Sequence, residues 1–472
     1  MSILIGTLMS AVDTTIVILA LLKINQGLHS TFLDTIWVIL IYLLVLATLT
    51  TQMGRLGDIF GRGRIFNAGF LVFIVGSAMS GAAPDIGFLI GSRAVQGFGA
   101  VMLQSNSSAI VADHFPPEER GKAFGITAMG WNIGGTLGIV LGGLITTLIG
   151  WRYIFYINVP IGLIGFVIAL EYIRDNKRTS VKIDFAGTGL LLAALVLIAY
   201  GATNVAGYGL DTFNLALIIS GILVFVPFVL VEKYAKSPML ALRAFKVRLL
   251  SFSLLAAFLQ AVGYLSVVFI LIMYLQGVRG FSPLYAALIL VPGYVLASLL
   301  APLMGRLSDR IGAGFVATTG IFFMAMGIMV YFFLTVTSTI YLVILGSLIS
   351  GFGGAMFWPS NNSAVMSGAP RDLYGSISGL LRTLSNMGTL LSYVITVSVA
   401  SLAVSRTVAF EVFLGVHAKV PASFINGIHS ALTVSIILLI VAGFLSAGRI
   451  RRRSTSGEPS SSVQSYNMQS PK

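Results

Sequence analysis

The 472-residue chain has no cysteine and few charged residues, and each shortage excludes a class of protein. Without cysteine there are no disulfides, no thiolate nucleophile and no Cys-ligated metal. Charged residues make up 10% of the chain and hydrophobic residues 57%, whereas a soluble domain carries about 25% charged residues. The chain is therefore not a single water-soluble globule.

Apolar runs long enough to cross a bilayer as helices recur along the whole sequence. Lipid offers no partner to backbone N–H and C=O groups, so spans are helices or a closed barrel, and barrel strands would alternate apolar and polar residues. We therefore predict an all-α integral membrane protein with fourteen transmembrane helices. The predicted spans cover residues 2–23, 35–53, 65–83, 86–112, 123–148, 153–173, 185–204, 213–232, 249–276, 284–304, 314–335, 340–365, 375–403 and 427–448.

The positions of Lys and Arg predict the orientation. With the N-terminus inside, 22 of the 29 Lys and Arg residues fall in cytoplasmic segments and five in external ones. Such an excess is typical of cytoplasmic loops, so we predict that both termini are inside. The net charge of +13 then reflects topology and does not predict a nucleic-acid partner. The cluster at 449–453 is expected to anchor the chain at the membrane surface, with lipid recognition as a less favoured additional role. The Ser-rich tail after it is expected to be disordered.

Two pairs of motifs recur about 250 residues apart. G-R-L-G-D-I-F-G at 54–61 and G-R-L-S-D-R-I-G at 305–312 share five of eight residues, and both are expected to be short cytoplasmic loops. G-F-G and S-N-S-S-A at 97–109 likewise match G-F-G and S-N-N-S-A at 351–364. The repeat predicts a six-helix bundle at 1–173, a two-helix insert at 174–248, a second bundle at 249–448 and the tail at 449–472. Parallel repeats are typical of transporters whose halves rock around a midplane site.

The segment at 54–64 resembles the signature of the major facilitator superfamily, G-x-L-x-D-x-x-G-R-x-R. D-T-T-I-V at 13–17, W-R-Y-I-F at 151–155 with N-V-P-I-G at 158–162, and Y-L-Q at 274–276 are similar to its fourteen-span drug:proton antiporter branch. The resemblance implies a multi-pass exporter of amphipathic organic compounds in a prokaryotic cell membrane. It implies a small-molecule substrate, protons and lipid as partners, no cofactor because the proton gradient drives transport, and a monomer.

Two ionisable residues lie deep within predicted spans, where insertion of a charge costs about 2.5–3.5 kcal/mol. Asp13 is the one acid in the central part of a span, so we predict that it carries the coupled proton; the alternative is an acid permanently paired with a polar neighbour. Arg93 begins R-A-V-Q-G-F-G at 93–99, which resembles the family motif whose arginine is implicated in proton transfer. The alternative for Arg93 is a structural link to backbone carbonyls.

The charged residues of the two repeated motifs are predicted to form a latch that closes the cytoplasmic face. Helix capping is the simpler alternative. The predicted gate consists of Gly54, Asp58, Gly61, Arg62, Arg64, Asp309 and Arg310.

Polar and aromatic residues inside several spans are candidates for a central substrate cavity, although each could instead serve a helix contact. They are Gln96, Gln104, Trp131, Asn132, Gln260, Tyr264, Trp358, Asn361, Arg382 and Asn386. The fifth span carries glycines at four-residue spacing, which predicts close helix packing. Its G-I-V-L-G-G at 138–143 has Ile139 where the antiporter branch has proline.

The alternatives to a drug exporter are a narrower transporter, a membrane-embedded enzyme and a channel. A narrow exporter or facilitator of an anionic or neutral metabolite is favoured by Arg93, Arg382 and the missing proline. A membrane-embedded enzyme is disfavoured because no metal-ligand spacing, nucleotide loop or nucleophile with a base is found, and the histidines at 29, 114, 417 and 429 form no pattern. A channel is disfavoured by the two-bundle repeat.

Overall fold

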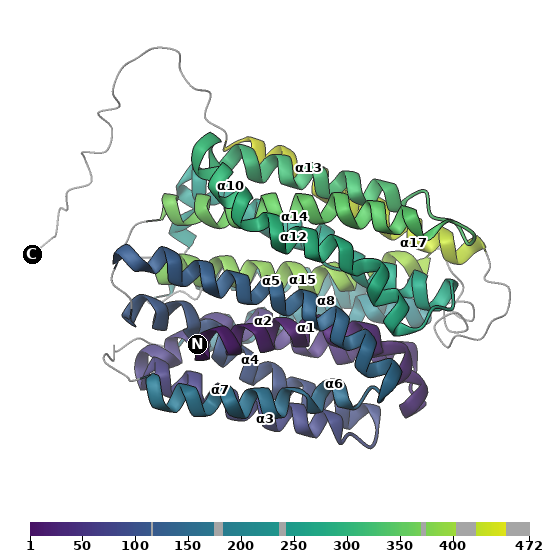
Figure 1. Cartoon of the computed structure of the whole chain (residues 1–472), viewed down its shortest axis with the longest axis horizontal. Coiled ribbons are helices and arrows are strands. Elements are labelled where there is room, and N and C mark those ends of the chain that lie inside the picture. Colours follow the sequence, from purple (N-terminus) through teal and green to yellow (C-terminus); the bar gives the residue numbers. More distant parts are fainter. Residues whose placement is uncertain (115–116, 174–182, 236–241, 370–373, 403–421, 450–472) are drawn as a thin grey trace, which may run out of the picture.

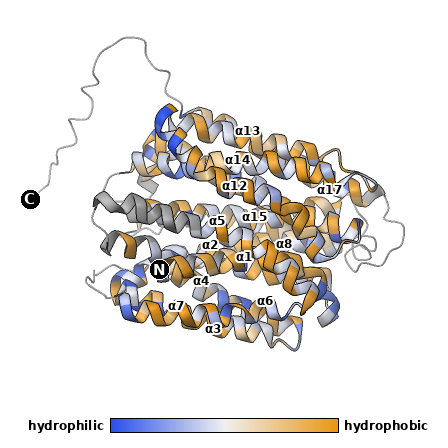
Figure 2. Cartoon of the chain, in the orientation of Figure 1, coloured by the Kyte–Doolittle hydropathy of each residue, from blue (hydrophilic) through white to orange (hydrophobic). Residues whose placement is uncertain are grey.

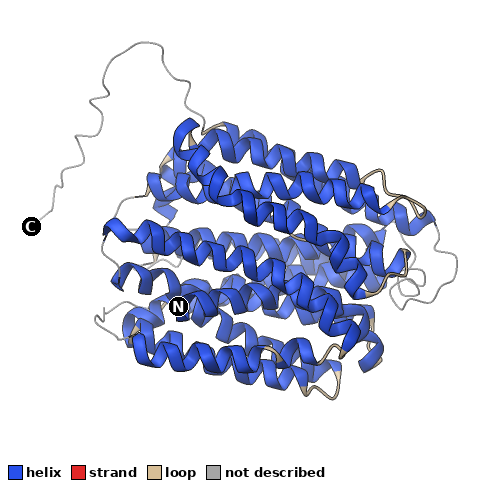
Figure 3. Cartoon of the chain, viewed as in Figure 1, coloured by secondary structure: helices blue, strands red, loops and turns tan. Residues whose placement is uncertain are grey.

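The computed structural model describes residues 1–114, 117–173, 183–235, 242–369, 374–402 and 422–449. Within these residues every regular element is a helix, and Figure 3 shows no strand among them. The prediction of an all-helical protein is thus confirmed. The tail at 450–472 lies outside the described residues.

Many of the described helices begin only a few residues after the preceding helix ends. The first nine are α1 (Ser2–Leu28), α2 (Phe32–Phe60), α3 (Arg62–Gly81), α4 (Ile86–His114), α5 (Pro117–Leu148), α6 (Tyr153–Tyr156), α7 (Asn158–Tyr172), α8 (Phe185–Tyr208) and α9 (Thr212–Tyr234). The others are the 3₁₀-helix η1 (Leu242–Lys246), α10 (Arg248–Tyr264), α11 (Val267–Ile272), the π-helix η2 (Met273–Val278), α12 (Pro283–Ile311), α13 (Ala313–Tyr331), α14 (Ile340–Gly368), α15 (Tyr374–Leu402) and α17 (Ala422–Ala447).

Thirteen of the described helical segments are long and apolar enough to cross a membrane, and α5 adds a shorter apolar helix at its C-terminal part. Two spans expected to be single helices are broken. The sixth is interrupted at Ile157, three residues before Pro160, which has no N–H to continue the helical ladder. The ninth is interrupted at Ser266, whose backbone N–H is bonded to the Ser392 hydroxyl of α15 at 3.0 Å.

The two repeated motifs are helical, which corrects the expectation of loops. Residues 54–60 form the last turns of α2, and residues 305–311 form those of α12. Only Gly61 and Gly312 leave the helix, with φ of 109° and 103°, a region that strongly favours glycine. Each motif therefore ends a long helix and turns directly into the next one.

Figure 1 shows α1 to α7 on one side of the molecule and α12, α13, α14 and α17 on the other. The two sides meet where α2 packs on α15 and α5 packs on α12, and α8 contacts both α2 and α15. We call the end at which α2, α12 and α17 terminate the basic end, and the opposite one the distal end. Hydrophobic residues run along the helices between these ends (Figure 2).

Glycines allow the closest helix contacts. A Cβ on Gly76 of α3 would lie 2.4 Å from the backbone nitrogen of Gln96, and one on Gly99 of α4 would lie 2.3 Å from that of Phe73. On α5, a Cβ on Gly138 would lie 2.6 Å from the Val12 carbonyl of α1. The predicted close packing of the fifth span is confirmed, and it brings α5 against the helix that carries Asp13.

We expect Gly99→Ala to lower the stability of the protein, because the added methyl must separate α3 from α4. Overpacking of this kind costs about 1–3 kcal/mol. Gly91→Ala is the matched control on the same helix, since its Cβ would meet no atom within 4 Å. Thermal unfolding of the purified protein in detergent measures both; equal melting temperatures for the two variants would contradict the expectation.

Candidate functional site

Asp13 and Arg93 form an ion pair inside the α1 to α7 side of the molecule. The Arg93 Nη1 donates to Asp13 Oδ2 at 2.6 Å, and the two side chains are 1% and 0% exposed. The Arg93 Nε also donates to the Val38 carbonyl of α2 at 3.2 Å. The guanidinium lies over the Tyr42 ring, 4.3 Å from its centre. Arg93 therefore has the backbone-carbonyl contact of the structural alternative and also contacts the acid, while its role in proton transfer stays a prediction.

A shell of amides and one hydroxyl holds this pair. Gln96 donates to Asp13 Oδ1 at 2.8 Å and accepts from Arg93 Nη1 at 2.6 Å. The Ser77 hydroxyl of α3 accepts from Gln96 at 3.0 Å and from the Asn158 amide at 3.1 Å, and it donates to the Phe155 carbonyl at 2.8 Å. Ser77 thus uses its one donor and both acceptor positions, which fixes Gln96 against Asp13.

The break in the sixth span supplies two of these contacts. Phe155 lies in the short helix α6 and Asn158 begins α7, with the interruption at Ile157 between them. Pro160 prevents a continuous ladder here, so carbonyls and side chains at the break are available to other helices. The sequence N-V-P-I-G thereby connects the sixth span to the Asp13 site.

Three polar atoms in this region are buried without a hydrogen-bond partner. They are the Ser10 hydroxyl oxygen, the Tyr42 hydroxyl oxygen and Asn158 Oδ1. Ser10 lies three residues before Asp13 on α1, and the Tyr42 hydroxyl and the Asn158 amide face the Asp13 carboxylate. The site therefore contains more hydrogen-bonding capacity than the ion pair uses.

The predicted gate residues divide between the two motifs. Asp58 and Arg62 form an ion pair at 2.7 Å, four residues apart across Gly61, so the pair joins α2 to α3. Arg64 is exposed on the first turn of α3, and Gly54 lies on α2 beside Ser105 of α4. Asp309 and Arg310 are exposed on the last turn of α12. The position that corresponds to Arg62 is Ala313, so the second motif has no equivalent pair.

Three of the predicted cavity residues lie where the two sides of the molecule meet. The Arg382 guanidinium of α15 lies over the Trp131 ring of α5, 5.2 Å from its centre. Asn386 of α15 donates to the Thr50 hydroxyl of α2 at 3.2 Å, beside a Thr51–Thr383 hydroxyl contact at 2.9 Å.

The other cavity candidates are dispersed. Gln260 is buried and donates to the Met324 sulfur at 3.6 Å, while Tyr264 is half-buried and faces Ser350. Trp358 is half-buried and packs edge-on against Phe357. Gln104 is buried with neither amide atom paired. The Asn132 side chain lies outside the described residues.

Asn361 lies at the basic end and contacts Arg449, which corrects two expectations. Arg449 Nη1 donates to Asn361 Oδ1 at 2.6 Å and to the Ser253 hydroxyl at 2.9 Å. Arg449 is only 8% exposed, so it is not a surface anchor. Asn361 is fully buried and occupied by this arginine, because the Arg449 side chain packs against α10 and α14.

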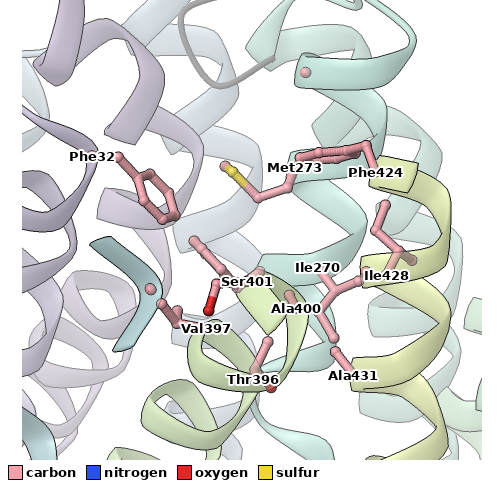
Figure 4. Close-up of a pocket in the computed structure, with 14 residues that line it drawn as sticks. Phe32, Ile270, Met273, Thr396, Val397, Ala400, Ser401, Phe424, Ile428 and Ala431 are labelled. Carbon is pink, nitrogen blue, oxygen red and sulfur yellow. The ribbon is translucent and has the colours of Figure 1, made fainter. Parts of the chain in front are cut away.

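An apolar pocket opens at the distal end, between the beginning of α2 and the helices α11, α15 and α17. Figure 4 shows Phe32 and Met273 facing each other across it. Thr396 and Ser401 are its only polar side chains among the described lining residues, and none of the predicted cavity residues lines it. Such a pocket suits the hydrophobic part of a small molecule.

The family is decided by comparison with known proteins. The family model described as Major Facilitator Superfamily matches residues 3–393. The chain belongs to the major facilitator superfamily. It is 31% identical over 460 residues to a puromycin resistance protein of Streptomyces alboniger, which covers 94% of this chain and 88% of that protein. It is 30% identical over 384 residues to a riboflavin transporter of Clostridioides difficile (strain 630), which covers 81% of this chain and 83% of that protein.

The fold agrees with this family. A bacterial homolog of the human lysosomal transporter Spinster, in an inward-facing and unoccupied conformation, superposes with a TM-score of 0.64 at 18% identity over 95% of this chain and 96% of that one. Major facilitator proteins are transporters, not enzymes, and the chain is accordingly a multi-pass membrane transporter of small molecules. Its bacterial relatives point to a prokaryotic plasma membrane.

Sequence analysis missed three members of the Asp13 site. Asn158 could have been found, since it is a polar residue two positions before Pro160 in an apolar segment. Tyr42 and Ser77 carried no such signal, because aromatic and small hydroxyl residues are common in membrane helices. Only the packing of α2 and α3 around α4 shows that they contact Arg93 and Gln96.

We expect Arg93→Gln to destabilise the protein by about 3–5 kcal/mol, because it leaves Asp13 charged and buried without a cation. Combining it with Asp13→Asn should recover part of the loss, since neither charge then remains. Unfolding of the two single variants and the double variant forms a thermodynamic cycle. Purely additive effects would show that the two side chains do not depend on each other.

Proposed function

We propose that this transporter exports amphipathic organic compounds in exchange for protons by alternating access, with Asp13 as the proton carrier. The observation that carries the proposal is the Asp13–Arg93 ion pair, fully buried within helices that cross the membrane. A guanidinium does not lose its proton in proteins, so Asp13 is the member of the pair that exchanges one. Proton uptake then changes the site from neutral overall to positive.

The surplus polar atoms support this cycle. A protonated Asp13 gains an O–H donor and requires an acceptor, and the Tyr42 hydroxyl and Asn158 Oδ1 are unpaired and buried beside it. Arg93, released from the carboxylate, keeps the Val38 carbonyl, the Gln96 carbonyl oxygen and the Tyr42 ring as partners. Both protonation states of the site thus have hydrogen-bond partners within the protein.

Helix α1 connects this site to the other side of the molecule. Its Leu19 carbonyl, six residues after Asp13, accepts from Gln276 of η2 at 3.2 Å. Thr147 of α5 accepts from the backbone N–H of Leu284 of α12 at 3.1 Å. Both contacts lie toward the distal end, so a shift of α1 caused by neutralising Asp13 would act on the contacts that close this end. Charge-driven repacking of such contacts is a known way to move domains.

The organisation of the two halves also belongs to this proposal. The matching φ angles of Gly61 and Gly312 and the repeated motifs support a parallel repeat, with α8 and α9 inserted between the halves. The Lys and Arg distribution supports both termini in the cytoplasm, which makes the basic end the cytoplasmic one. In that orientation the Asp58–Arg62 pair belongs to the cytoplasmic gate. We further propose that the transporter acts as a monomer.

A narrower transporter of a neutral or anionic metabolite is the second candidate. It is favoured by Arg382 over Trp131 at the meeting of the two sides, which presents a cation beside a flat ring. The relative named as a riboflavin transporter is consistent with such a substrate.

We expect Asp13→Asn to abolish proton movement driven by substrate. The purified protein is reconstituted in liposomes that contain a pH reporter, and puromycin, riboflavin and a panel of cationic, neutral and anionic amphiphiles are added against an imposed proton gradient. Asp85→Asn is the control, because Asp85 is exposed between α3 and α4. Proton movement that survives in Asp13→Asn would remove its proposed role, and transport of substrate without proton movement would favour the second candidate.

We expect Tyr42→Phe to leave stability within about 0.5 kcal/mol, because its hydroxyl is unpaired in the ion-paired state. Proton exchange should slow about fivefold, the equivalent of one lost hydrogen bond of about 1 kcal/mol in the protonated state. Melting temperature and liposome proton flux measure the two effects separately. Tyr200→Phe on α8 is the control, and an unchanged flux in Tyr42→Phe would exclude Tyr42 as a partner of the protonated acid.

A further inference from the structure

Arg449 is a buried cation whose guanidinium has neutral side chains as its hydrogen-bond partners among the described residues. It lies two residues after the end of α17, at the basic end, and is 8% exposed. Among the described residues no carboxylate forms an ion pair with it; its contacts there are the Asn361 amide oxygen and the Ser253 hydroxyl. Burial lowers the pKa of its guanidinium to about 10, so Arg449 stays charged at neutral pH. An uncompensated buried charge is costly, and its retention here requires an explanation.

The buried polar atoms of Arg449 and Asn361 that have no hydrogen-bond partner are all donors. Nη1 makes the hydrogen bonds to Asn361 and Ser253, while Nε and Nη2 are buried without an acceptor. These two nitrogens form the side edge of the guanidinium, which binds two oxygens of one carboxylate or phosphate at once. The Asn361 amide nitrogen is also buried and unpaired, while its amide oxygen accepts from Arg449.

Other arginines close to Arg449 in the fold or in the sequence add positive charge. Arg449 itself follows the end of the membrane-spanning helix α17. Arg248 at the start of α10 is exposed and donates to the Gly448 carbonyl at 3.1 Å, next to Arg449 in the chain. The sequence continues with Arg451, Arg452 and Arg453. Basic residues at the end of a membrane span attract anionic headgroups with about 1 kcal/mol each. The positive charge of these arginines and the unpaired N–H donors of Arg449 therefore both favour an anionic ligand.

We propose that Arg449, with Asn361 and Ser253, forms a binding site for a phosphate group at the basic end of α10, α14 and α17. The phosphate of an anionic lipid headgroup is the ligand that the position of the site favours. It would accept from the Nε and Nη2 edge of Arg449 and neutralise the buried charge, holding the end of α17 against α10 and α14. This site is separate from Asp13 and does not depend on the proposed transport cycle.

The test measures phosphate binding to the full-length protein after removal of lipid in detergent. Native mass spectrometry with added phosphatidylglycerol or phosphatidylcholine is compared for wild type, Arg449→Gln and the control Arg306→Gln, which removes an exposed arginine of α12. We expect wild type and the control to retain phosphatidylglycerol at least tenfold more strongly than Arg449→Gln. In a second arm, stabilisation by inorganic phosphate in the absence of lipid that is lost in Arg449→Gln would assign the site to the free anion.

Arg449→Lys guards against a loss caused by misfolding, because it keeps the charge and removes the two-nitrogen edge. We expect it to elute as a single species on size exclusion and to bind phosphatidylglycerol several-fold more weakly than wild type. The proposal is overturned if Arg449→Gln and wild type retain phosphatidylglycerol equally and respond equally to inorganic phosphate. The proposal is also overturned if Arg306→Gln weakens phosphatidylglycerol binding as much as Arg449→Gln does. Such a result would mean that binding depends only on the total positive charge of the protein.

Discussion

The burial of the Asp13–Arg93 ion pair is the constraint on which the α1 to α7 side of the structure depends. Two charges removed from water need close contact and additional hydrogen bonds to be tolerated. Here the contacts come from five elements: Val38 and Tyr42 of α2, Ser77 of α3, Gln96 of α4, Phe155 of α6 and Asn158 of α7 surround a carboxylate on α1. Each of these helices is held in place partly by what it contributes to the pair.

Close helix approach makes that arrangement possible. Gln96 reaches both Asp13 and Ser77 because Gly76 brings α3 against the Gln96 backbone, and Gly99 brings α4 against the Phe73 backbone of α3. On the opposite face of α1, Gly138 lets α5 pack on Val12. Ile139, which departs from the proline of the antiporter branch, is fully buried beside this contact. The α1–α5 packing therefore rests on small residues and does not require a proline kink.

Sequence alone was sufficient for properties that follow from composition and period, and insufficient for those that depend on pairing between distant helices. The helical class and nearly all spans follow from apolar runs, and Asp13 and Arg93 stand out because charge is rare in them. That these two residues contact each other across 80 positions is a property of packing. The motif at 54–61 was misinterpreted as a loop because glycine and charge are typical of loops, yet only Gly61 leaves the helix. Arg449 was assigned to the surface by its neighbours in sequence, whereas the fold buries it.

Arg93, Arg382 and Arg449 differ in which groups compensate their charge, and this difference separates their roles within the protein. Arg93 has a carboxylate, Arg382 an aromatic ring and Arg449 an amide and a hydroxyl. Of these three sites, only the Asp13–Arg93 pair can change its net charge by proton exchange, because only Arg93 is paired with a carboxylate. In the proposed cycle the α1 to α7 side therefore responds to protons, while the side that carries Arg382 keeps a constant positive charge. In that cycle a rise in proton occupancy at Asp13 would add positive charge to the α1 to α7 side, which disfavours a cationic substrate and promotes its release.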